Sequence, residues 1–129
     1  MDFDYTNIRG NYLPLVAIEL KWKDQVRFKA HADSGATTSL FHASVAAMIG
    51  IDIDKGRKTE AMVADGSFIA IYLHKIPVKF CGKEFEAMIG FSKRLGSELN
   101  ILGRIDFFDR FVFCFDDHNK MLSVDEIKM

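Results

Sequence analysis

Apolar and polar residues alternate along much of this chain with the period of two that is typical of β-strands. The clearest case is segment 25–32, in which Val26, Phe28 and Ala30 would point to one side and the residues between them to the other. An apolar run at 12–20 precedes it across a polar turn. Together the two runs predict an antiparallel hairpin near the start of the chain.

The remaining pattern is also mainly that of short strands. We expect them at Lys58 to Val63, Ser67 to His74, Ile76 to Phe80, Glu84 to Phe91, Leu99 to Gly103, Arg110 to Phe115 and Met121 to Val124. Helical composition is confined to 42–49, which Gly50 would end as a left-handed cap, and to a short stretch at 104–109. Residues 1–11 fit either a loose arm or an edge segment. Many short strands with one or two short helices predict an all-β sandwich or barrel.

Composition and charge narrow the class of protein. A length of 129 residues fits one domain spanning 1–129, and a hydrophobic content of 49% is enough for a buried core. The net charge of −1 and the lack of any basic run give no reason to expect a nucleic-acid partner. No apolar run is long enough to cross a membrane, and the N-terminus has no signal-peptide pattern.

The cysteines and histidines offer little chemistry. Cys81 and Cys114 lie far apart in strand-like runs, which predicts two buried, reduced thiols rather than a disulfide framework. The four histidines are too scattered to suggest a metal site. We therefore expect a soluble, cytoplasmic protein without metal or cofactor and without a membrane partner.

One stretch does carry candidate chemistry, at the end of the alternating strand. Asp33 is the only acid in an apolar neighbourhood, and it is followed by Ser34, Gly35 and Ala36. Gly35 allows a sharp turn and close approach of another group, while the hydroxyl of Ser34 can fix the turn by hydrogen bonding. Such a stretch can present one carboxylate at the base of a cleft. On its own it is equally an ordinary Asp-Ser-Gly turn, which favours those residues for local reasons.

A second unusual feature is the hairpin expected around Ala64-Asp65-Gly66. Asp-Gly between two strand-like runs is a strong hairpin signal. The flanks of a hairpin tip are usually polar, but here Val63 and Ile69 are among several apolar residues close to it. We expect these flanks to face something other than water.

The order of these features resembles the retropepsin-like, or retroviral-type, aspartic protease family, over residues 12 to 125. The matching motifs are the Asp33-Ser34-Gly35-Ala36 turn, the Gly-ended helix, the Ala64-Asp65-Gly66 hairpin and the Ile101-Leu102-Gly103-Arg104 stretch. The resemblance implies a closed, barrel-like acid-protease single lobe with one or two short helices, acting as a homodimer.

The resemblance also implies roles for individual residues. Asp33 would be catalytic, and Ser34, Gly35 and Ala36 would support it. The hairpin tip Ala64-Asp65-Gly66 would be the flap over an extended peptide or protein substrate, and the walls of its pockets would be Val63, Ile69 and Ile101.

The implied activity is aspartic endopeptidase, in which a pair of Asp carboxylates activates water for peptide hydrolysis. Because the chain has one Asp-Ser-Gly, each subunit of a homodimer would supply Asp33. An alternative on the same fold is a catalytically inactive dimerisation or peptide-binding module. Thr37 stands where viral members commonly have an acid that pairs with the Arg of the second motif, which leaves open whether Arg104 keeps a partner.

Overall fold

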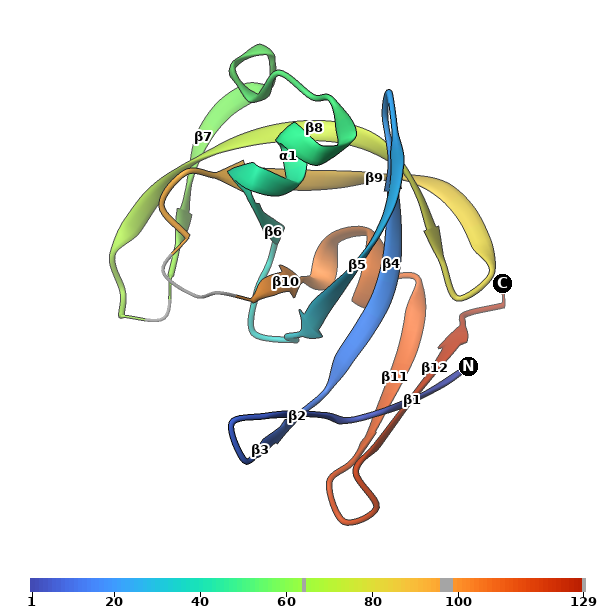
Figure 1. Ribbon diagram of the computed structural model, residues 1–129. Coiled ribbons are helices and arrows are strands. Elements are labelled where there is room, and N and C mark those ends of the chain that lie inside the picture. Colours follow the sequence, from blue (N-terminus) through green and yellow to red (C-terminus); the bar gives the residue numbers. More distant parts are fainter. Residues whose placement is uncertain (64, 96–98, 129) are drawn as a thin grey trace.

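The structure, a computed structural model, describes residues 1–63, 65–95 and 99–128. Its elements follow one another along the chain (Figure 1) as β1 (Asp2–Asp4), β2 (Thr6–Ile8), β3 (Asn11–Leu13), β4 (Leu15–Lys21), β5 (Gln25–Ala32), β6 (Ser39–His42), α1 (Ala43–Ile49), η1 (Ile53–Lys55), β7 (Arg57–Met62), β8 (Phe68–Phe80), β9 (Lys83–Ser92), β10 (Asn100–Leu102), η2 (Arg104–Phe108), β11 (Phe111–Asp116) and β12 (Met121–Glu126). The expectation of a mostly β chain with short helices is confirmed.

The largest sheet closes on itself. Its seven strands lie in the order β4-β5-β10-β6-β9-β8-β7, and an additional pairing joins β4 to β8. In that pairing Glu19 lies opposite Lys79, and Leu20 opposite Val78. Closure gives most of these strands hydrogen-bonded neighbours on both sides, while β7 projects beyond the ring as the outer strand of a hairpin with β8 (Figure 1). The barrel-like lobe expected from the resemblance is therefore present.

The alternation predicted for segment 25–32 is confirmed as β5, which pairs with β4 in antiparallel register. The strand predicted to begin at Tyr12 is interrupted, however. Tyr12 lies in β3, which pairs with β2, and β4 begins only after Pro14. Proline has no N–H to donate and fixes its own φ, so it separates the two strands.

The runs predicted at 67–74 and 76–80 are wrong as two separate strands. They form one continuous strand, β8, of 13 residues. Its first part pairs with β7 and its second part with β9, and Tyr72 and Leu73 have partners on both sides. The buried positions change from odd numbers, as at Ile71, to even numbers, as at Ile76. This change interrupts the apolar–polar alternation of the sequence and therefore suggested two strands.

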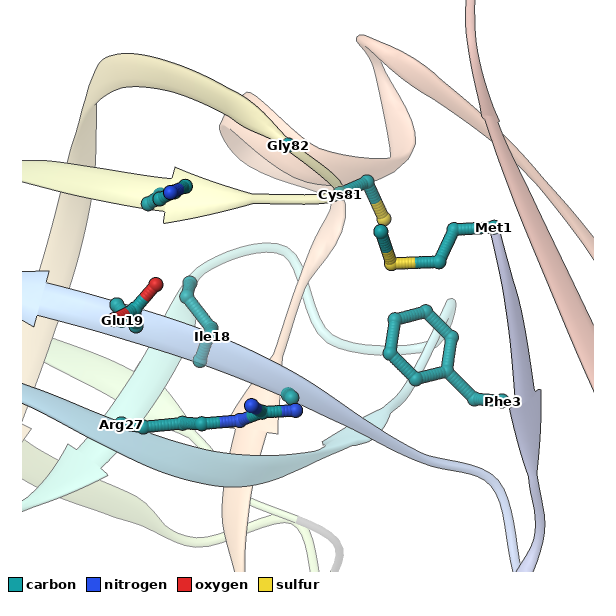
Figure 2. Close-up of a pocket in the computed structure, with 9 residues that line it drawn as sticks. Met1, Phe3, Ile18, Glu19, Arg27, Cys81 and Gly82 are labelled. Atoms are coloured by element: carbon teal, nitrogen blue, oxygen red, sulfur yellow. The ribbon is translucent and has the colours of Figure 1, made fainter.

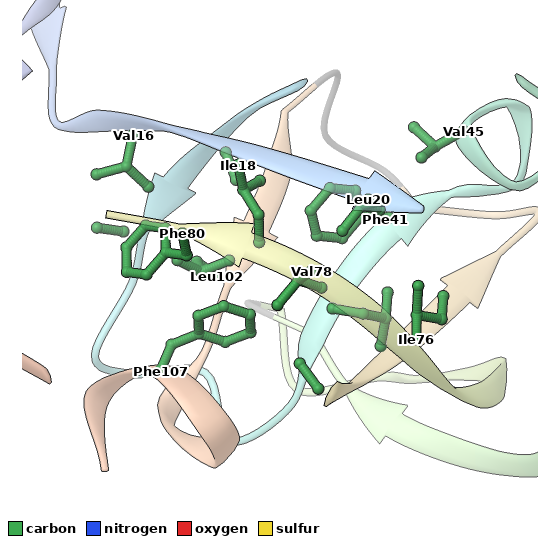
Figure 3. Packing of buried hydrophobic residues seen from close by; sticks show 14 of the residues in the cluster. Val16, Ile18, Leu20, Phe41, Val45, Ile76, Val78, Phe80, Leu102 and Phe107 are labelled. Atoms are coloured by element: carbon green, nitrogen blue, oxygen red, sulfur yellow. The ribbon is translucent and has the colours of Figure 1, made fainter. Parts of the chain in front are cut away.

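The core lies inside the closed sheet, where Figure 3 shows side chains from β4, β6, β8, β10 and η2 packed together. Phe80 is central, because its ring makes edge-on contacts with Phe107 at 5.5 Å and with Phe111 at 5.0 Å between ring centroids. Edge-on aromatic pairs of this kind contribute about 0.5–1.5 kcal/mol beyond their buried area. Phe111 belongs to β11, so this cluster ties the smaller terminal sheet to the barrel.

The helical predictions are confirmed in one case and modified in the other. Of the predicted stretch 42–49, residues 43–49 form α1 while His42 ends β6, and Gly50 caps the helix at φ 85° as expected. The stretch at 104–109 is not a continuous helix, because Asp106 stands at φ 72° within η2. The Asp106 carboxylate accepts a non-local bond from Met88 N at 2.8 Å and a local one from Arg110 at 2.9 Å.

The two ends of the chain meet in a second sheet with the order β1-β12-β11. Asp2 lies opposite Ser123, so the pairing of β1 selects the edge segment over the loose arm for the first residues. A hollow of about 200 Å³ lies beside β1, and Figure 2 shows Met1, Phe3, Ile18 and Cys81 around it. None of its lining residues belongs to the Asp33 turn.

The cysteines differ from expectation. Both thiols are free, but only Cys81 is partly buried, and Cys114 is exposed on the edge strand β11. Burial raises the pKa of the Cys81 thiol to about 11, so it stays protonated at neutral pH. Within the described ranges no helix is long and apolar enough to span a membrane.

Candidate functional site

Asp33 stands where two central strands of the barrel end. The strands β5 and β10 run parallel there, with Ala32 opposite Leu102. Directly after this pair, the N–H of Asp33 donates to the carbonyl of Leu102 at 3.0 Å. Asp33 therefore begins its turn while still attached to the sheet, and its side chain is partly exposed.

The Asp33 turn, residues 33–36, is shaped by the carboxylate itself. Oδ1 of Asp33 accepts the N–H of Gly35 at 2.9 Å, and the carbonyl of Asp33 accepts the N–H of Ala36 at 3.1 Å. A Cβ at Gly35 would lie 3.1 Å from Oδ1, so a larger residue would crowd the carboxylate that the turn holds. Ser34, at the tip, is exposed.

The second motif is packed directly against this turn. The carbonyls of Ala36 and Thr37 accept the N–H groups of Arg104 at 2.8 Å and Ile105 at 3.0 Å. A Cβ at Gly103 would lie 2.8 Å from the backbone of Thr38 and 2.9 Å from the carbonyl oxygen of Ala36. Only glycine fits between these backbones, which explains why the apolar pair 101–102 is followed by Gly103.

One supporting residue was missed in the sequence. Ser39 is fully buried, and its Oγ accepts the N–H of Gly103 at 2.9 Å. The available signal was a hydroxyl at the start of the apolar run Ser39-Leu40-Phe41, a place where an unpaired polar group would be unfavourable. The open question about Arg104 is also answered, because its guanidinium donates to Oγ1 of Thr37 at 3.2 Å.

The hairpin of β7 and β8 ends in the predicted turn, of which residues 63 and 65–67 are described and Ala64 lies outside the described residues. The N–H of Val63 donates to the carbonyl of Ser67 at 2.9 Å, and Gly66 adopts φ 85°. Oδ1 of Asp65 accepts the N–H of Ser67 at 2.8 Å and its hydroxyl at 2.5 Å. These bonds favour the charged carboxylate and lower the pKa of Asp65.

The two faces of this hairpin differ. Met62 and Phe68 lie opposite each other and are 67% and 64% exposed. Ile69 lies on the other face, opposite Ala61, and is partly buried, as is Val63. The inner face of the hairpin is therefore the one that carries the two predicted wall residues.

Packing links this inner face to Ile101. Ile71 follows Ile69 on the same side of β8, and a Cβ at Gly90 would lie 3.1 Å from Ile71 Cδ1 and 3.2 Å from Leu40 Cδ2. Leu40 in turn lies opposite Ile101 in β10. Val63 and Ile69 are therefore partly buried on the hairpin, and Ile101 lies beside Leu40, which approaches the same Gly90 as Ile71.

The site offers one carboxylate from one chain. Within residues 1–63, 65–95 and 99–128, no group of three or more His, Cys, Asp and Glu side chains is arranged to hold a metal ion. The structure brings Asp33 together with Gly35, Ala36, Gly103 and Arg104. The Asp65 turn is attached to the same barrel through β8. Its carboxylate bonds to Ser67, whereas the Asp33 carboxylate bonds to Gly35.

Comparison with known proteins identifies the fold. Neither a protein-family profile nor a curated protein sequence matches the chain. Among solved structures, a retropepsin-like aspartic protease from Rickettsia conorii superposes with a TM-score of 0.69 at 19% identity, over 97% of this chain and 98% of that one. EIAV protease in complex with the inhibitor HBY-793 superposes with a TM-score of 0.56 at 18% identity, over 77% of this chain and 88% of that one.

Proposed function

Starting from this retropepsin-like fold, we propose that the chain is an aspartic endopeptidase that hydrolyses peptide bonds as a homodimer. The observation that carries the proposal is the Asp33 turn. Its carboxylate is fixed through Oδ1 by Gly35, at the end of two strands, and stays partly open to solvent. A carboxylate that is held in place but still accessible is suited to acid–base chemistry on a bound substrate.

The reaction requires a second carboxylate. When two carboxylates lie close together, repulsion between like charges disfavours ionisation of both, so the pair holds one proton between them. The charged member accepts a proton from a bound water, whose oxygen attacks the scissile carbonyl carbon. The protonated member donates to the carbonyl oxygen, and the resulting tetrahedral species breaks its C–N bond as the leaving nitrogen takes up a proton.

This chain contributes one half of such a pair. Asp33 begins the only Asp-Ser-Gly in the sequence, so the second Asp33 comes from another copy of the chain. A two-fold axis between the copies gives both carboxylates the same surroundings. In this proposal Ser34, which is exposed at the tip of the turn, hydrogen-bonds across the pair and holds the two turns together.

The substrate in this proposal is an extended peptide. The hairpin tip Ala64-Asp65-Gly66 acts as a flap that covers the peptide and excludes water from the carboxylates. The apolar surface formed by Val63, Ile69 and Ile101 favours apolar side chains on either side of the cut. The two free cysteines support a reducing, cytoplasmic setting for this activity.

The decisive experiment is Asp33→Asn. Replacing the acid–base group is expected to lower the cleavage rate of a peptide library by about 10⁴-fold or more. The matched control is Asp24→Asn, which removes an exposed carboxylate in the turn between β4 and β5 and leaves cleavage unchanged. Cleavage that survives Asp33→Asn contradicts the proposal. A dimer that binds peptides but cleaves none of them anywhere between pH about 3 and 7 identifies instead an inactive peptide-binding module.

A further inference from the structure

The strand β5 has one face in the core and one polar face. Ala30 and Ala32 belong to the core cluster, and alternate residues of a strand face opposite sides of the sheet. His31, between them, and Asp33, directly after the strand, therefore lie on the other face. Residues two apart on a strand are separated by about 6–7 Å. His31 thus precedes the carboxylate by one step on the face that carries it.

His31 lies in a row of side chains that crosses the sheet. It is opposite Leu15 in β4 and opposite Ile101 in β10, and Ile101 is in turn opposite Leu40 in β6. Residues directly opposite each other share a face of the sheet, and neighbouring strands lie about 4.8 Å apart. His31 is therefore the immediate neighbour of Ile101, one of the wall residues of the proposed site.

His31 is the one polar residue of this row. Leu15 and Leu40 are buried although neither belongs to the core cluster, so apolar packing continues on the outer face of the sheet here. His31 is partly buried, whereas Arg27 and Lys29, earlier on the same face of β5, are exposed. Within the part of the chain that the structure describes, the His31 ring makes no hydrogen bond or ion pair. Its ring nitrogens are therefore available to a ligand.

The charges beside His31 favour an anionic group on one side of it. Lys29 lies one step before His31 on the same face, and the residue opposite Lys29 in β4 is Ala17, which has no charge. On the other side lies Asp33. A carboxylate placed between His31 and Lys29 meets two cationic groups once the imidazole is protonated, and it stays on the side away from the Asp33 pair.

We propose that His31 selects a glutamate side chain next to the cut. The proposal rests on the proposed function, because it assigns a substrate preference to the same site. The methylene groups of the glutamate lie against Ile101, and its carboxylate accepts a charge-assisted hydrogen bond from the imidazole. Because a homodimer repeats the pocket, the preference holds on both sides of the cut. Ile101 alone would favour a wholly apolar side chain, and His31 adds a place for one charge at its edge.

Peptides that differ at one position test this selection. Glutamate, glutamine and leucine are compared next to the cut in one sequence, at a pH of about 5, where a free imidazole is protonated and a free glutamate is mostly ionised. The glutamate peptide is expected to have a kcat/KM about tenfold above that of the glutamine peptide, because hydrogen bonds between charged groups are the stronger ones.

The variant His31→Gln keeps a hydrogen-bond donor but loses the charge, so it is expected to bring the ratio of glutamate to glutamine close to one. Its cleavage of the leucine peptide shows that it folds. The matched control is His118→Gln, which changes a histidine in the exposed turn between β11 and β12 and should leave the tenfold ratio in place. A ratio that survives His31→Gln overturns the role of His31.

The outcomes separate this inference from the endopeptidase proposal. Cleavage of the leucine peptide together with equal kcat/KM for glutamate and glutamine overturns the selection and leaves the endopeptidase standing. If no peptide is cleaved, the endopeptidase is contradicted, and affinities for the same peptides are measured by calorimetry. Tighter binding of the glutamate peptide that His31→Gln removes then supports the selection in a binding module, whereas equal or absent binding overturns it.

Discussion

The Asp33 turn and the Asp65 turn have the same local design and different surroundings. In each, Oδ1 of the aspartate accepts the N–H of the residue two positions later, at 2.9 Å for Gly35 and at 2.8 Å for Ser67. The Asp33 turn is also held by β10 and η2, whose backbones bond to it at Leu102 and Arg104. The Asp65 turn is bonded within its own hairpin, through Val63, Asp65 and Ser67.

The bonds that give each turn its shape are thus distinct from the contacts that restrain its movement. Local side-chain bonding is enough to form either turn. Contacts from distant parts of the chain also restrain the Asp33 turn, whereas the bonds of the Asp65 turn are made within its own hairpin. Local opening is governed by how many such contacts a segment has, so the same substitution should have different consequences in the two turns.

The largest effect is expected for Gly103→Ala, which strikes the contacts that hold the Asp33 turn. The new Cβ would lie 2.8–2.9 Å from backbone atoms of Thr38 and Ala36, and Ala36 cannot move away without disturbing its hydrogen bonds to Asp33 and Arg104. We expect the free energy of unfolding to fall by about 3 kcal/mol, measured by urea denaturation. Stability equal to that of the unmodified chain would show that the two motifs are not in rigid contact.

A smaller effect is expected for Gly66→Ala in the flap. Gly66 stands at φ 85° with nothing within 4 Å of a Cβ, so alanine adds about 1 kcal/mol of backbone strain without a clash. If the closed flap needs this turn, kcat/KM for peptide cleavage falls about fivefold.

The chain offers a matched control for this flap variant. Gly10→Ala introduces the same strain at φ 86°, also in open space, in the hairpin of β2 and β3. It should leave kcat/KM unchanged while costing similar stability. Equal kinetic losses in the two variants would contradict a role for the flap turn.

The smallest effect concerns the Asp65 carboxylate and pH. Its bonds to Ser67 lower the pKa of Asp65 below the ordinary 3.8, so the charged form that holds the turn persists as the solution is acidified. The contribution of the carboxylate is present above the unfolded value and is lost only as pH falls through the lower folded value. The amide resonance of Ser67 should therefore titrate below pH 3.8.

The same resonance provides the control. In Asp65→Asn the titration of the Ser67 amide should disappear, whereas Asp24→Asn should leave it in place. A midpoint at or above the ordinary value for aspartate in the unmodified chain would mean that the turn is not held by charge.

Features that depend on interactions between neighbouring residues could be predicted from the sequence. The strand at 25–32 and the helix ending at Gly50 depend on local periodicity and a local cap, and both are confirmed. The fold itself was predicted through the order of the four matching features, because their spacing reflects a common architecture.

The rest depended on contacts between distant residues. The burial of Ser39 beneath Gly103 joins positions 64 apart, and the pairing of β1 with β12 joins the two ends of the chain. The kink at Asp106 arises because its carboxylate binds Met88 from another strand. No local pattern signals such partners, so these features could be found only once the chain was seen folded.

The undivided length of β8 has a mechanical consequence. At about 3.3 Å per residue, the 13 residues of this strand span on the order of 40 Å. One end carries the flap turn, and the other is clamped between β9 and β4 at Val78. The pairing partner of β8 changes from β9 to β7 at Tyr72 and Leu73, which pair with both strands. Under the proposed function, opening of the flap would be a bend of β8 about these two residues, which lie in the barrel wall.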